Sequence, residues 1–145
     1  MNTARYLGLD VGERRIGVAL GDAGARLATP LTTLQAHPPE RVIEQLGRLI
    51  REHAITALVL GLPLTLRGEV GPQAQSVQRF AATLKASLGL PIHFFDERLT
   101  SAAADQLLRE MGVKPEKRKL QIDQVAAAII LQDFLDQRHQ PHKDQ

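Results

Sequence analysis

The order of hydrophobic patterns along the chain limits its fold more than any other feature. Two short apolar runs, residues 5–10 and 15–20, are separated by a Gly-containing segment, which predicts an antiparallel hairpin. A third strand is expected over residues 27–34, where Pro30 restricts it to an edge or to two short pieces. Helical and strand patterns then alternate. A helix opened by Pro38 and Pro39 is followed by a strand over 55–60, a helix over 73–88 and a strand over 91–95. Two helices complete the chain, one from Thr100 or Ser101 to Met111 and one over 122–138. This order predicts an α/β fold, a mixed sheet with helices on both faces.

Length and composition narrow the class of protein. A chain of 145 residues can bury one hydrophobic core, so we expect a single domain over residues 1–138 and a disordered tail over 139–145. The chain has no cysteine, so any metal must be held by oxygen or imidazole ligands. Because the first residues match neither a signal peptide nor a membrane span, we expect a cytoplasmic protein without a membrane partner. The net charge of +2 permits nucleic-acid binding without requiring it.

Acidic residues stand where strands end and where the last helix begins. Asp10 ends the first strand, Asp96 and Glu97 end the last strand, and Asp123 starts the final helix. Ligands of such sheets gather at the carboxyl ends of parallel strands, so these acids would meet if the first and last strands were neighbours. Converging carboxylates suit Mg²⁺ or Mn²⁺, which can support phosphodiester hydrolysis. From spacing alone, an ordinary role as strand-end and helix-start acids is equally well supported.

Four segments of the chain resemble the signature blocks of a known family. They are LGLDVGERRIGVALGD (7–22), LVLGLPLTLRGEVG (58–71), DERLTSAAA (96–104) and IDQVAAAIILQ (122–132), and they resemble, in order, the blocks of the YqgF family. That family is similar to the RuvC resolvases, and its members are described as Holliday junction resolvases or as nucleases that mature the 5′ end of 16S ribosomal RNA. The resemblance implies an RNase H-like fold. It also implies that Asp10, Glu97 and Asp123 are the catalytic, metal-binding acids of a two-metal nuclease using Mg²⁺ or Mn²⁺.

Basic residues near these acids are candidates for binding nucleic acid. Arg98 follows Glu97, and its guanidinium can hold a phosphate through two hydrogen bonds. Lys117, Arg118 and Lys119 lie in a basic segment before Asp123, which we interpret as a loop that grips a phosphate backbone. Arg14 and Arg15 can contact phosphate or serve as surface charges of the hairpin. With no Trp, one Tyr and four Phe, base stacking is not expected to dominate affinity.

The chain departs from the family pattern in the loop after Pro63 and just before the final block. Thr65 and Arg67 replace residues typical of many members, which makes the loop after Pro63 more basic, and Gln121 stands where a Lys often precedes the final block. Gly61 and Pro63 shape this loop, either for structural reasons or so that nucleic acid can approach the backbone.

These observations predict a metal-dependent nuclease acting on structured RNA or branched DNA. Maturation of the 16S ribosomal RNA precursor is the first hypothesis, and a Holliday junction resolvase, which would need a homodimer for symmetric cleavage, is the alternative. Two other classes remain open. One is a non-catalytic nucleic-acid-binding module, which should tolerate mutation of the acids. The other is an actin-like or sugar-kinase fold, because residues 8–20 also resemble its first phosphate motif, although such folds need two domains.

Overall fold

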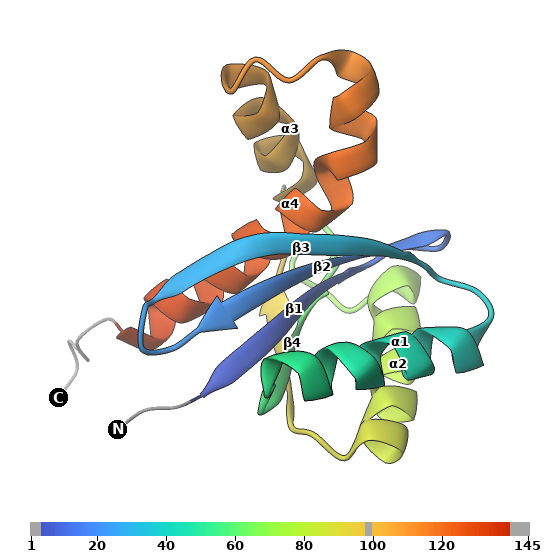
Figure 1. Ribbon diagram of the computed structural model, residues 1–145. Helices are drawn as coiled ribbons and strands as arrows, with labels where there is room; N and C mark the ends of the chain where they lie inside the picture. Colours follow the sequence, from blue (N-terminus) through green and yellow to red (C-terminus); the bar gives the residue numbers. More distant parts are fainter. Residues whose placement is uncertain (1–3, 98–99, 140–145) are drawn as a thin grey trace, which may run out of the picture.

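The computed structural model describes residues 4–97 and 100–139 and contains one five-stranded mixed sheet (Figure 1). Its strands are β1 (Arg5–Val11), β2 (Arg15–Asp22), β3 (Leu27–Gln35), β4 (Ala57–Leu62) and β5 (Ile92–Asp96), in the order β3-β2-β1-β4-β5. β1 pairs with β2, and β2 with β3, in antiparallel fashion, whereas β1 with β4 and β4 with β5 are parallel. The predicted mixed α/β sheet is therefore confirmed. The first and last strands are not neighbours, because β4 lies between them.

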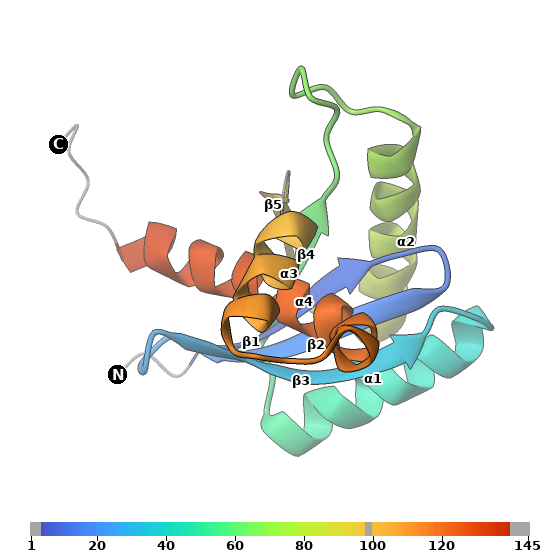
Figure 2. The ribbon, with the colours of Figure 1, turned by 90° about the horizontal axis from the view of Figure 1, so that it is seen from above.

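Helices cover both faces of the sheet, as the alternating pattern predicts. α1 (Pro39–His53) and α2 (Pro72–Leu88) lie on one face, and α4 (Pro115–His139) lies on the other (Figure 1). α3 (Thr100–Glu110) packs against the first part of α4, and Figure 2 shows this pair in front of the sheet. None of the described helices is long and apolar enough to cross a membrane.

The two cores follow the two-residue period of the strands. Leu7 and Leu9 of β1 are fully buried in the core under α1 and α2, together with Val42 and Leu46 of α1. Tyr6, which directly precedes Leu7, points to the opposite face and belongs to the core under α4. Because side chains alternate along a strand, the next residue in the phase of Tyr6 is Gly8 and the next is Asp10. Asp10 therefore lies on the α4 face of the sheet.

The last helix begins earlier than its apolar pattern predicts. The prediction placed its start at Ile122 and left residues 114–119 in a loop, whereas α4 starts at Pro115. Proline suits the first helical turn, and the charged residues that follow are good helix formers. α3 holds this part of α4, because Arg118 donates to Asp105 and a small core of Ala104, Leu108, Val125 and Ala126 joins the two helices. The interpretation of a basic loop is thus wrong, since these residues form the first turns of a helix.

Candidate active site

Asp10 and Glu97 form a pair of hydrogen-bonded carboxyl groups at the carboxyl edge of the sheet. Asp10 stands near the end of β1, and Glu97 directly follows β5. The backbone N–H of Glu97 donates to the carbonyl of Leu62, 3.3 Å away, which fixes the start of the segment after β5 against the end of β4. The separation of β1 and β5 by one strand does not keep the two acids apart, because the Glu97 side chain reaches back across β4.

Gly61 in β4 makes this reach possible. A Cβ atom at this position would overlap the Glu97 carboxyl group and the side chain of Ile130. One interpretation of the sequence was that nucleic acid approaches the backbone at Gly61. In the structure Gly61 is buried beneath the side chains of Glu97 and Ile130, so its backbone is not accessible to nucleic acid. Its role is to make room for Glu97.

The pair holds a proton at neutral pH. Burial raises the pKa of Asp10, a hydrogen bond from Glu97 lowers it, and the nearby charge of Asp123 raises it. Burial, followed by the charge of Asp10, the hydrogen bond to it and the charge of Asp96, raises the pKa of Glu97 to about 9. Glu97 is therefore the protonated partner and donates to the Asp10 carboxylate. Two acids in this arrangement share one negative charge.

Asp123 lies beside this pair on α4. The helix packs so closely on β2 that a Cβ atom at Gly17 would overlap the backbone carbonyl of Asp123. Arg15, which follows the β1–β2 turn, donates from Nε to the Asp123 carboxylate at 2.6 Å. Among the described residues, no three acidic or histidine side chains surround a common point as metal ligands would. The structure thus brings Asp10 and Glu97 into contact, and it places Asp123 near them in an ion pair with Arg15.

The donor chemistry of the site fits a divalent cation. Two carboxyl groups kept together by a shared proton offer oxygen ligands to a hard ion, which can take the place of that proton. Asp123 supplies a further carboxylate within electrostatic range of Asp10. Cysteine is absent and the acids provide only oxygen, the ligand set that Mg²⁺ and Mn²⁺ prefer.

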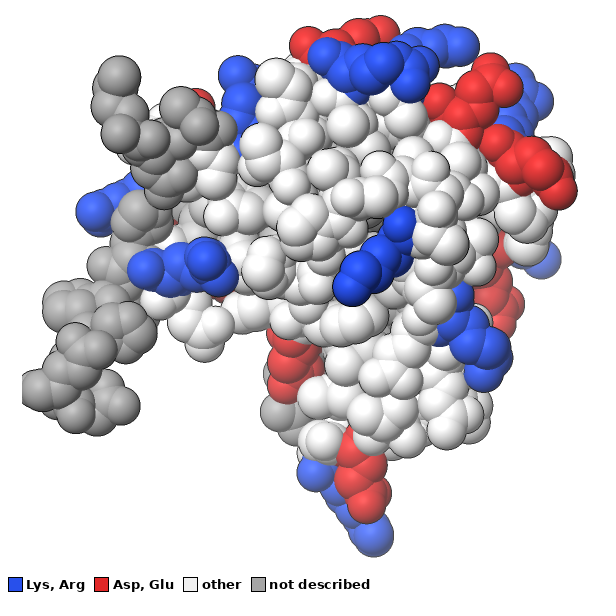
Figure 3. Space-filling model, turned by 90° about the horizontal axis from the view of Figure 1, so that it is seen from below, with Lys and Arg blue, Asp and Glu red and all other residues white. Residues whose placement is uncertain are grey.

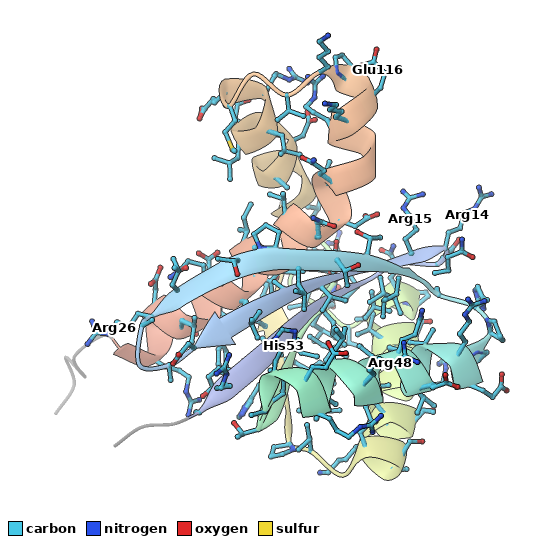
Figure 4. All side chains as sticks on the ribbon, in the orientation of Figure 1. Arg14, Arg15, Arg26, Arg48, His53 and Glu116 are labelled. Carbon is cyan, nitrogen blue, oxygen red and sulfur yellow. The ribbon has the colours of Figure 1, made fainter. Side chains whose placement is uncertain are left out.

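The candidate basic residues have different surroundings. Arg14 and Arg15 project from the end of the β1–β2 hairpin, and only Arg15 is bonded to Asp123 (Figure 4). Lys117 is exposed on the first turn of α4. Arg118 points inward and donates to Asp105 at 3.1 Å and to the Val113 carbonyl at 2.9 Å, which ties α4 to α3.

Two further predictions fall on parts that the structure does not describe. Arg98 lies outside the described residues. The α4 helix includes Lys119, but the side chain of Lys119 lies outside the described part.

The face covered by α1 and α2 is opposite to the one on which Asp10 lies. Figure 3 shows basic and acidic side chains interspersed around its rim, without one large basic area.

Gly17 is a residue of the site that the sequence reasoning missed. The visible signal was the run Gly17, Ala19, Gly21, which places small residues at two-residue spacing on one face of β2. Such spacing is typical of a strand that another element approaches closely. The predicted hairpin drew attention to the turn instead of to this face.

The chain matches a known protein family over almost its whole length. A family model described as "RuvX: Holliday junction resolvase" matches residues 4–137. A protein of Chloroflexus aurantiacus named "Putative pre-16S rRNA nuclease" is 64% identical over 138 residues, which cover 95% of this chain and 90% of that protein. A protein of Chloroflexus aggregans with the same name is 62% identical over 141 residues, covering 97% of this chain and 99% of the relative.

Solved structures of resolvases share the fold. RuvC of Thermus thermophilus, in complex with a Holliday junction substrate, matches with a TM-score of 0.56 at 14% identity, over 93% of this chain and 95% of that chain. The fowlpox virus resolvase, in complex with Holliday junction DNA, matches with a TM-score of 0.57 at 7% identity, over 94% of this chain and 99% of that chain. At these identities the likeness establishes the fold, which is the RNase H-like fold that the sequence blocks implied.

Proposed function

Because the chain belongs to the RuvX family, the same family that the sequence blocks resemble, we propose that it is a metal-dependent nuclease that matures the 5′ end of the 16S ribosomal RNA precursor. The observation that carries the proposal is the hydrogen-bonded pair of Asp10 and Glu97 at the carboxyl edge of the sheet. The name shared by the relatives at 62% and 64% identity supports RNA as the substrate. A protein that processes the ribosomal RNA precursor would act in the cytoplasm, which agrees with the predicted location.

In this proposal the acids hold a divalent cation and the basic residues hold the substrate. Asp10, Glu97 and Asp123 are the ligands, and Mg²⁺ or Mn²⁺ bound there would activate water and stabilise the leaving oxygen of a phosphodiester. Glu97 would have to release its proton to hold such an ion, because the proton and the ion would compete for the same carboxyl oxygen atoms. Arg15 orients the Asp123 carboxylate through the 2.6 Å hydrogen bond.

Phosphate contacts are assigned to the basic residues of the hairpin, of α4 and of the segment after Glu97. Arg14 is exposed on the β1–β2 hairpin next to Arg15, which binds Asp123, and Lys117 is exposed on α4, the helix that carries Asp123. Arg98 and Lys119 complete the proposed set. Arg118 serves the α3–α4 contact through Asp105, so its part in binding is indirect.

A second function is favoured by the description of the family. A Holliday junction resolvase makes two symmetric cuts, so this alternative requires a homodimer that presents two sites to a branched DNA. Trimming of an RNA end requires one site only. The oligomeric state and the substrate therefore separate the two functions.

The test compares cleavage of four labelled substrates by the wild type and by Asp10→Asn. The substrates are a ribosomal precursor fragment, single-stranded RNA, duplex DNA and a four-way junction, each with Mn²⁺, Mg²⁺ or EDTA. We expect metal-dependent cleavage of the precursor fragment and a loss of at least about a hundredfold in Asp10→Asn, because the variant loses an anionic ligand. Preferred cutting of the junction by a dimer would select the second function. Binding without cleavage, unchanged in Asp10→Asn, would instead identify a non-catalytic binding module.

A further inference from the structure

The aromatic residues of this chain are few but concentrated. A groove of about 680 Å³ lies between β5 and the end of α4. Its lining includes His93, Phe94 and Phe95 of β5, and Phe134, Gln137 and Arg138 of α4. Three of the four phenylalanines of the chain therefore line one groove. Composition alone argued against base stacking, but it could not show this clustering.

The rings are held in a fixed arrangement. The guanidinium carbon of Arg138 lies 5.2 Å from the centre of the Phe134 ring, and the centres of Phe134 and His93 are 5.3 Å apart. Tyr6 packs edge-on against Phe134 at 5.3 Å and against His93 at 6.5 Å. Tyr6 and Phe134 are buried, whereas His93 and Phe95 are partly exposed. The buried rings thus fix the position of the His93 ring, and Phe95 packs against the core under α4, which lowers the entropy cost of binding a flat ligand.

One end of the groove, at Phe95, lies next to the candidate active site. His93 pairs in register with Val59, and Phe95 with Gly61, so both share the face of the sheet on which the Glu97 carboxyl group lies over Gly61. Phe95 is thus level with the Glu97 carboxyl group, and because strand residues rise about 3.3 Å each, His93 lies about 7 Å further along β5 from the acids. One extended nucleotide spans a step of this size. A polynucleotide whose scissile phosphate lies at Glu97 would pass its neighbouring bases over Phe95 and His93.

The chemistry of the groove suits a single strand of nucleic acid. Arg138 provides a cation for a phosphate, and ring faces stack on any base without regard to sequence. Burial, and then the charge of Arg138, lowers the pKa of His93, so its ring is neutral and stacks as an aromatic group. β5 is also an edge strand of the sheet, so a second copy of the chain is the competing occupant. The cation and the position of Phe95 beside the acid pair favour nucleic acid instead.

We propose that this groove binds the two nucleotides of a single-stranded RNA segment that lie next to the scissile phosphate. Their bases stack on Phe95 and His93, and Arg138 binds a backbone phosphate. The inference rests on the proposed nuclease function and adds to it the position of the single-stranded part of the substrate.

The test measures binding apart from cleavage. Fluorescence anisotropy in EDTA gives the affinity for a labelled oligouridylate of about eight nucleotides. We expect Arg138→Gln, His93→Ala and Phe95→Leu each to weaken binding about tenfold. Arg48→Gln is the matched control, because Arg48 lies exposed on α1, on the other side of the sheet, and should bind as the wild type does (Figure 4). Thermal unfolding verifies that each variant is folded, and Arg138→Gln changes only an exposed side chain.

Cleavage in Mn²⁺ separates failure of this inference from failure of the proposed function. If the wild type cuts RNA and the KM falls as the single-stranded segment grows, Arg138→Gln should flatten that dependence. Variants that bind as the wild type does would overturn the inference while leaving a cutting nuclease intact. A wild type that never cuts would refute the proposed function, and the anisotropy would still decide whether the groove binds RNA. A change in sedimentation with unchanged RNA affinity would assign the groove to a second copy and overturn the inference as well.

Discussion

Glu97 shows how much of the site depends on contacts between residues that are far apart in the sequence. Its position at the end of a strand could be predicted, and so could that of Asp10. Their hydrogen bond could not be, because it depends on a glycine in the intervening strand and on the angle at which the chain leaves β5. Because they share a proton, the pair carries one negative charge instead of two.

This proton has a consequence for stability. The pKa of Glu97 is about 9 in the folded protein and 4.5 as its ordinary value, so between these values the folded state retains a proton that the unfolded state has lost. The free energy of unfolding therefore falls as the pH rises from about 4.5 to about 9. Glu97→Gln keeps a donor for Asp10 but does not titrate. In EDTA at about pH 7 we expect it to be more stable than the wild type by roughly 3 kcal/mol, and this gain to vanish below about pH 4.5.

Urea denaturation in EDTA over this pH range measures the effect. Glu52→Gln is the matched control, since Glu52 is exposed on α1 and should leave the pH dependence unchanged. Added Mn²⁺ should stabilise the wild type more than Glu97→Gln, because the variant lacks a ligand. Equal pH profiles for the wild type and Glu97→Gln would show that Glu97 is ionised in the folded protein.

At the scale of elements, the sequence predicted which segments are helices and strands, but not the strand order or the contacts between helices. The hairpin, the edge strand with Pro30 and the alternating helices are confirmed, because local periodicity determines them. The start of α4 was misplaced because the charged residues of its first turn lack the apolar spacing that predicts a helix, and contact with α3 stabilises this part. The strand order was open because loop length does not determine which side of β1 the chain returns to. Arg118 was expected to bind phosphate, and only its contact with Asp105 shows its structural role.

The contact between α4 and β2 is the element-level feature that positions Asp123. At Gly17 a methyl group would overlap the carbonyl oxygen of Asp123 and the backbone around it, which side-chain rearrangement cannot relieve. We expect Gly17→Ala to destabilise the protein by about 1–3 kcal/mol and to reduce cleavage further than the fraction unfolded explains, because α4 must shift. Denaturant unfolding and cleavage rates measure the two effects.

Gly47 provides the matched control for this substitution. It lies within α1, where a Cβ atom would meet Arg51 at 3.5 Å and Leu88 at 3.8 Å, both ordinary contacts. Gly47→Ala should therefore stabilise the protein by about 0.5–1 kcal/mol through helix propensity. If Gly17→Ala behaved in the same way, the close packing of α4 on β2 would not position the site.

At the scale of the whole molecule, the distribution of charge matters more than its sum. The net charge is only +2, and the face covered by α1 and α2 mixes both signs around its rim (Figure 3). Candidate phosphate contacts in the described residues, Arg14, Lys117 and Arg138, lie on the hairpin and on α4. The molecule should therefore bind nucleic acid through a small set of cations next to its acidic pair.

A small set of phosphate contacts predicts a weak dependence of affinity on salt. Each neutralised phosphate of a single strand contributes about −0.7 to the slope of log affinity against log salt concentration, so three contacts give a slope of about −2. Lys117→Gln and Arg14→Gln should each reduce that slope by about 0.7, whereas Arg48→Gln on α1 should not change it. Anisotropy titrations of labelled RNA in EDTA at several KCl concentrations measure these slopes. If Arg48→Gln reduced the slope as much as Lys117→Gln, the RNA would cross the α1 and α2 face, and binding could not be confined to the side of the molecule that carries Asp10 and Glu97.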